Sequence, residues 1–194
     1  MSIATTIPAR MTADGFFELK NLAHPGKVEL VNGQLRMQHY ASGAHATIQA
    51  TLARLIGNHL VAKRPGWRVA TEGGVQTTFD AKHNVRRPDL TVTCSPHTKG
   101  ERALPSPVLL IQVMSPNNPD DQWETIRALA NIGSVREIMV VDAETIDVQV
   151  FHRDDPSQDW PTEPVRAGAG GTVHLAALDL DLAVADIYWA TALD

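Results

Sequence analysis

The 194-residue sequence has little cysteine, and its lysines are unevenly distributed. Cys94 is the one cysteine, which excludes an internal disulfide and any cysteine-rich zinc site. All five lysines lie at or before Lys99, so the second half of the chain has none. The formal net charge of -5 argues against a general nucleic-acid coat protein, because such proteins bind phosphates through an excess of positive charge.

A long apolar stretch is also missing from residues 1–10, where a signal peptide or a membrane span would be sought. We therefore expect a cytoplasmic protein without a membrane partner. Hydrophobic residues make up 43% of the chain, enough for a sizeable core. The composition does not shift along the sequence, so we expect one domain over residues 1–194.

Hydrophobic spacing and turn residues predict a mixed order of helices and strands. Helices are expected over residues 11–22, 42–63, 120–131 and 184–189. Strands are expected over residues 67–79, 90–94, 108–113, 136–141 and 146–152, with a last short pair within 172–182. Asn32-Gly33 separates two alternating runs, 28–31 and 34–37, and this dipeptide favours a type I′ turn. The sequence therefore predicts a hairpin there.

The most informative motif is Arg87-Pro88-Asp89-Leu90, followed about twenty residues later by the apolar run 108–113. Proline fixes its own φ and biases its neighbour towards extended geometry, so Asp89 is expected at the mouth of a strand. A second strand ending in a carboxylate beside it would complete a site for a hard cation such as magnesium. At that position the sequence has the neutral amide Gln112.

Six short segments, in this order and spacing, carry a resemblance to a known family. They are VELVNGQL with Glu29, SGAHATIQATL with His45, RRPDL, LLIQVMSPNN, SVREIMVVD and LAALDLDLAVADIY. Together they resemble the Uma-type putative restriction endonucleases, a branch of the PD-(D/E)XK nuclease superfamily. The resemblance implies an α/β (α+β) fold of the restriction-endonuclease-like type, with a mixed central β-sheet flanked by helices. It also implies a homodimer and a magnesium-dependent site for cleaving phosphodiesters.

Carried over position by position, the resemblance implies that Glu29, Asp89 and Gln112 are catalytic and hold magnesium or manganese, and it places His45 near the cleft. Because Gln112 lacks the charge of a carboxylate, we expect weak metal binding. The family's helix lysine falls on or beside Ile126, where this chain has none. Arg127 is a candidate substitute, although one residue along a helix turns a side chain by about 100°.

Each candidate also has a structural interpretation. Asp89 could cap a turn, Glu29 could be an outward strand residue, and Gln112 could be a buried, hydrogen-bonded amide. His45 could be a surface histidine at the start of a helix. The acids Asp120, Asp121 and Glu124 could stabilise a helix N-terminus through its dipole. Residues 82–87 could be a solvated turn, or Lys82, Arg86 and Arg87 could bind the phosphates of DNA.

Three functions remain open at this stage. The first is a magnesium-dependent DNA endonuclease with a degenerate active site and weak or altered activity. The second is a catalytically inactive nuclease-like module that binds DNA or protein. The third is an unrelated enzyme centred on His39, His45 and His59, which the sequence disfavours because these histidines lack the spacing of metal ligands. The missing acid and the missing lysine separate the first two.

Overall fold

The computed structural model describes residues 10–19, 26–38, 41–116 and 119–193. Its centre is a six-stranded sheet with the strand order β10-β9-β8-β7-β6-β3. These strands are β3 (Arg68–Thr71), β6 (Leu90–Thr93), β7 (Pro107–Met114), β8 (Glu137–Asp142), β9 (Val148–His152) and β10 (Val165–Ala167). Only β7 and β8 pair in parallel within this sheet, and the other neighbours are antiparallel. The predicted mixed sheet is confirmed.

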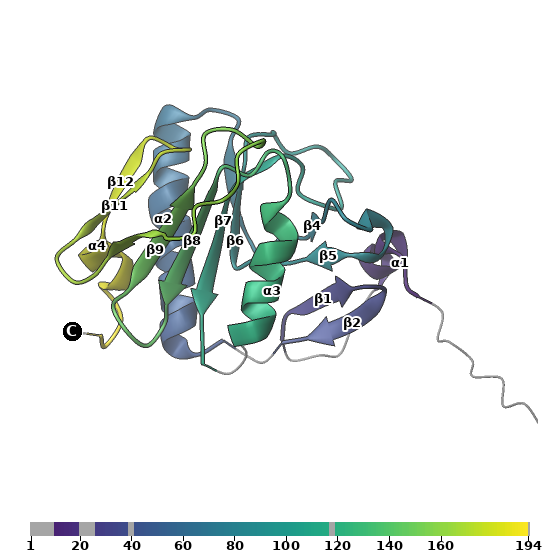
Figure 1. Cartoon of the computed structure of the whole chain (residues 1–194), viewed down its shortest axis with the longest axis horizontal. Coiled ribbons are helices and arrows are strands. Elements are labelled where there is room, and N and C mark those ends of the chain that lie inside the picture. The colour runs from purple at the N-terminus through teal and green to yellow at the C-terminus, as the bar shows by residue number, and fades with distance from the viewer. Residues whose placement is uncertain (1–9, 20–25, 39–40, 117–118, 194) are drawn as a thin grey trace, which may run out of the picture.

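Helices α2 (Gly43–Lys63) and α3 (Pro119–Ala130) cover opposite faces of this sheet (Figure 1). Successive strand residues point to opposite faces, so each face has its own core. Leu109 and Ile111 of β7 join the cluster that contains α2, whereas Leu110 joins the cluster that contains α3. This is why β7 is a continuous apolar run rather than an alternating one. No helix in the described part of the chain is long and apolar enough to span a membrane.

A smaller, four-stranded sheet lies beside α3, with the order β2-β1-β5-β4. Its strands are β1 (Val28–Val31), β2 (Gln34–Met37), β4 (Val75–Gln76) and β5 (Val85–Arg86). Asn32 and Gly33 have φ of 50° and 80° between β1 and β2, the positive values that a type I′ turn needs. The predicted hairpin is therefore confirmed.

Two short helical segments adjoin this sheet: α1 (Ala13–Glu18) and the 3-10 turn η1 (Ala81–His83). The Thr12 side chain caps α1 by accepting a hydrogen bond from the Gly15 backbone. The helix predicted over residues 11–22 ends at Glu18, and Leu22 lies outside the described residues.

The C-terminal part adds the hairpin β11 (Thr172–Leu175) and β12 (Leu180–Ala183), followed by α4 (Val184–Tyr188). Side chains of all three elements enter the core on the α2 face. The last strand pair and the terminal helix were predicted at these positions, and both are confirmed.

The strand predicted over residues 67–79 is wrong as a single element, because it divides into β3 and β4 in different sheets. Glu72 has φ of 50°, and a Cβ at Gly73 would overlap the Leu104 side chain. The chain turns at these residues and leaves the central sheet. The two-residue strand β5 was not predicted, because it lies inside the basic segment 82–87 and is too short to show a period.

We predict that the α2 side chains buried against the central sheet stabilise the fold, whereas the exposed side chains of the same helix do not. Leu52 is fully buried in α2, whereas Val61 on the same helix is 86% exposed. Leu52→Ala should lower the free energy of unfolding by about 2–5 kcal/mol through lost burial and a residual cavity. The control Val61→Ala should stay within about 0.5 kcal/mol of the wild type. Urea unfolding measures both, and equal losses would contradict this packing.

Candidate active site

Asp89 lies immediately before β6, one residue beyond the pair formed by Leu90 and Ile111 in the antiparallel register with β7. That register places Gln112 opposite Asp89. The Asp89 side chain is 2% exposed, and its Oδ2 accepts hydrogen bonds from Gln112 Nε2 and from the Val113 backbone, the latter at 2.8 Å. The two strands therefore bring Asp89 and Gln112 into direct contact.

A lysine and a histidine approach Oδ1, the other oxygen of the Asp89 carboxylate. Lys27 Nζ lies 2.8 Å from Asp89 Oδ1, and the Lys27 side chain is only 8% exposed. His45 Nε2 lies 3.4 Å from Oδ1. His45 is buried in the first turn of α2, where its backbone donates to the capping Ser42 hydroxyl. The site thus combines the hairpin, α2 and two neighbouring strands.

Burial on its own would raise the pKa of Asp89. The Lys27 ammonium and the His45 ring outweigh this effect and hold the pKa of Asp89 below its ordinary value. Asp89 is therefore ionised at neutral pH in spite of its burial.

Glu29 is fully buried in β1 and belongs to a second network. Arg36 Nη2 donates to its Oε2 at 2.7 Å, and the Thr125 hydroxyl donates to the same oxygen at 3.0 Å. The Arg87 backbone donates to Oε1 at 2.7 Å. Arg36 also contacts Glu124 at 2.6 Å, so this network links the hairpin to α3.

The two networks lie next to each other along one segment. Lys27 and Glu29 are two residues apart and so share one side of the hairpin strand. Lys27 reaches Asp89, while Glu29 binds the backbone of Arg87, two residues earlier. Within the described residues, however, no hydrogen bond joins Glu29 to Asp89 or Gln112. The three implied metal ligands are divided between two networks.

As arranged, these residues do not fit a magnesium ion. One feature favours a cation: Gln112 Oε1 is buried and has no hydrogen-bond partner. Against it, Lys27 holds Asp89 Oδ1, and Glu29 is bound to Arg36. Across the part of the chain that the structure describes, no group of three histidine, cysteine, aspartate or glutamate side chains is placed to hold a metal. Magnesium needs several free oxygen ligands in near-octahedral geometry.

Other candidate residues lie away from Asp89 or have internal partners. Arg127 is exposed on α3, two residues after Thr125 and therefore on another side of the helix. Ile126 is 6% exposed in the α3 core, so a lysine would not be accommodated there. His59 contacts the Leu178 carbonyl at 2.9 Å, and His39 lies outside the described residues.

The basic segment 82–87 is only partly available to a ligand. Arg86 is buried and donates to Glu124 at 2.8 Å. Arg87 is half-buried, and Lys82 is exposed. Asp120 and Asp121 lie in the first turn of α3, where acids were expected, and Asp121 and Glu124 also pair with Arg36 across to the hairpin.

Sequence reasoning missed two residues at the Asp89 site. Lys27 was not considered, although it directly precedes the predicted run 28–31 and lies two residues before Glu29, a spacing that was a usable signal. Gln49 donates to the Asp89 carbonyl at 2.9 Å. It follows His45 by one helical turn, which could have pointed to the same face of α2.

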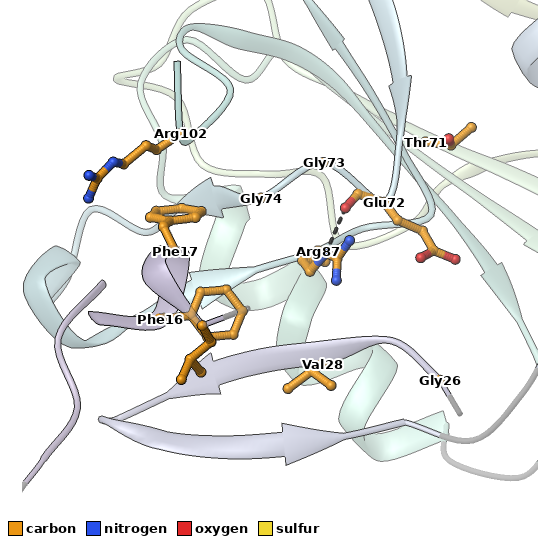
Figure 2. Close-up of a pocket in the computed structure, with 11 residues that line it drawn as sticks. Phe16, Phe17, Gly26, Val28, Thr71, Glu72, Gly73, Gly74, Arg87 and Arg102 are labelled. Carbon is orange, nitrogen blue, oxygen red and sulfur yellow. Dashed lines mark hydrogen bonds between the residues drawn. The ribbon is translucent and has the colours of Figure 1, made fainter. Parts of the chain in front are cut away.

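A cavity of about 540 Å³ lies beside Arg87, two residues before Asp89 (Figure 2). Phe16 and Phe17 form one side of it and Val28 another, and Arg87 lines it beside Glu72. Arg87 Nε donates to the Glu72 carbonyl at 2.7 Å, and the Glu72 backbone donates to the Asp89 carbonyl at 3.0 Å. The cavity wall is therefore tied to the Asp89 backbone.

Comparison with known proteins gives the same assignment as the motifs. The family model described as "Uma2: Putative restriction endonuclease" matches residues 13–185. The chain belongs to this family. The crystal structure of a putative nuclease belonging to DUF820 from Anabaena variabilis superposes on the Uma2 chain with a TM-score of 0.66 at 16% identity, covering 92% of this chain and 98% of that one. That likeness shows a shared fold. No curated protein matches the chain.

We predict that the Asp89–Lys27 pair of this Uma2 protein behaves as a buried ion pair. Asp89→Ala or Lys27→Ala should each lower the free energy of unfolding by about 3–5 kcal/mol, because either leaves an uncompensated buried charge. The double variant should lose less than the sum of the two. Asp154→Ala, at an 89% exposed carboxylate, is the control. Additive losses in denaturant unfolding would show that the two groups do not interact.

The lowered pKa of Asp89 also predicts a pH dependence. Its folded pKa lies below its unfolded value of about 3.9, so the stabilisation is complete above that value. It is lost as pH falls through the folded pKa. Asp89→Asn should remove this contribution and make the acid limb of the stability curve flatter than in the wild type. Identical acid limbs would contradict the assignment.

Proposed function

We propose that the protein is a nuclease-like enzyme of DNA, with a degenerate centre at Asp89 and Gln112 that cleaves phosphodiester bonds weakly because its residues, as arranged, do not fit the magnesium that the family resemblance implies. The observation that supports this is the convergence of Asp89, Gln112, Lys27 and His45 at the ends of β6 and β7. Family membership and the shared fold support a nuclease-like function in general.

Weak cleavage follows from the chemistry. Were magnesium held by Glu29, Asp89 and Gln112, as the family resemblance implies, it would supply a polarised phosphoryl oxygen and a more acidic attacking water. In this chain the amide of Gln112 replaces a carboxylate. Asp89, the acid beside it, is already paired with Lys27. Lys27 is also the positive charge that lies nearest to Asp89, where an ammonium could stabilise charge developing on a phosphoryl oxygen.

DNA contact is proposed along the segment that precedes Asp89. Lys82 is exposed, and Arg87 is one of the residues that line the cavity beside Phe16 and Phe17. Arg86 is a poorer candidate, because it is buried against Glu124 and its removal would disturb the contact of β5 with α3. We further propose a homodimer, as the family resemblance implies.

A second candidate function is favoured by the ion pairs themselves. Both acids that the family would use are neutralised inside the protein, Asp89 by Lys27 and Glu29 by Arg36. A chain arranged in this way could serve as a catalytically inactive nuclease-like module that binds DNA or protein.

Plasmid cleavage tests the first proposal. The wild type should nick supercoiled plasmid slowly, with or without added magnesium or manganese, and Asp89→Asn should reduce the rate by at least about a hundredfold. Asp154→Asn, at an exposed carboxylate, should cleave like the wild type. Activity that persists in a folded Asp89→Asn variant would place the catalytic centre elsewhere. No cleavage by the wild type, together with DNA binding that falls as salt rises, would favour the inactive module.

A further inference from the structure

The donors around Asp89 show what kind of site this chain has built. Lys27 Nζ and His45 Nε2 face Oδ1, and Gln112 Nε2 and the Val113 backbone face Oδ2. The amide of Gln112 must turn its nitrogen to Asp89, because two oxygens would repel each other. Each oxygen of the Asp89 carboxylate therefore faces groups that can donate hydrogen bonds. The negative charge of Asp89 is thus already balanced by groups of the protein itself.

We infer that Lys27 is the resident cation of the Asp89 site and replaces the divalent metal that the fold family implies. A magnesium ion on Asp89 Oδ1 would stand about 2.0–2.1 Å from that oxygen. Lys27 Nζ already lies 2.8 Å from it. The two cations would then be neighbours in a buried site, where like charges repel strongly.

The charge balance supports this inference. A centre with several carboxylates needs a divalent cation for neutrality. With Gln112 at one ligand position and Glu29 paired with Arg36, Asp89 contributes a single negative charge. The single positive charge of Lys27 neutralises it. The neutral Gln112 at an acid position and the ammonium of Lys27 beside Asp89 are therefore consistent with each other electrostatically.

The hairpin holds Lys27 in this position. The Gln38 backbone donates to the Lys27 carbonyl at 2.8 Å, which continues the β1–β2 ladder to Lys27. Two residues further, Glu29 is bound to the Arg87 backbone at 2.7 Å. Lys27 is therefore fixed on both sides, and its side chain is 8% exposed. For a metal to enter, the ammonium would have to leave Asp89 within this fixed framework.

This inference does not require that the protein cleaves DNA, so a binding measurement tests it separately. The full chain is titrated with manganese and followed by calorimetry and by the electron paramagnetic resonance of free Mn²⁺. The variants are Lys27→Met, which removes the charge, and Lys27→Arg, which keeps it. Lys99→Met is the matched control, because it removes an exposed lysine charge outside the site. Circular dichroism checks the fold of each.

The wild type, Lys27→Arg and Lys99→Met should bind no manganese at Asp89 at millimolar concentration. Lys27→Met should gain affinity by at least about tenfold, since a like charge beside the ion has been removed. Adding Gln112→Glu to Lys27→Met should strengthen binding further. Manganese binding by the wild type that disappears in Asp89→Asn would overturn the inference, and this result does not depend on any Lys27 variant folding. A folded Lys27→Met protein without any gain would also overturn it.

These outcomes are distinct from those of the cleavage assay. If the wild type binds no manganese yet nicks plasmid through Asp89, the resident cation is supported and the cleavage would be independent of a bound metal. If it binds manganese through Asp89 and does not nick, the inference fails while the binding-module function remains.

Discussion

The carboxylate and the carbonyl of Asp89 are where separate parts of the chain are joined. Lys27 brings the hairpin to the carboxylate, and His45 brings the start of α2. Gln112 belongs to the central strand β7. On the carbonyl side, Gln49 of α2 and the Glu72 backbone both donate hydrogen bonds. Asp89, which immediately precedes β6, therefore contacts three other parts of the fold at the end of the central sheet. These are the small sheet, helix α2 and the link between β3 and β4.

Such a junction is stable only if the charge is matched. A buried carboxylate without a partner pays a large desolvation penalty, and the same is true of a buried ammonium. Lys27 and Asp89 are both nearly inaccessible to solvent, so each makes the burial of the other possible. The buried carboxylate of Glu29 is neutralised in the same way by Arg36. Thr125 and the Arg87 backbone donate further hydrogen bonds to this carboxylate. The family's acids thus contribute to the packing of the hairpin against α3 and β6.

Much of the fold could be predicted because its signals are local. Asn32-Gly33 specifies a tight turn through positive φ, Ser42 caps α2, and Pro107 begins a strand whose side chains are apolar on both faces. The division at Glu72 and Gly73 could not be predicted, because it depends on the close approach of Leu104 from a distant loop. The pairing of Arg86 with Glu124 could not be predicted either, because it joins residues that are far apart in the sequence. Arg86 belongs to a basic segment of the sequence, but in the structure it forms an internal ion pair.

At the site, the sequence by itself determined the residue types: an aspartate after proline at a strand mouth, an amide where an acid was expected, and no lysine beyond Lys99. It also determined that Asp89 would lie at the mouth of a strand and Gln112 on a strand, since proline geometry and apolar runs are local properties. Only the tertiary structure decided that Lys27 would reach Asp89 and that Glu29 would turn to Arg36. Which cation neutralises a buried acid depends on the distances between side chains from different elements, and those distances exist only after the hairpin packs against the sheet.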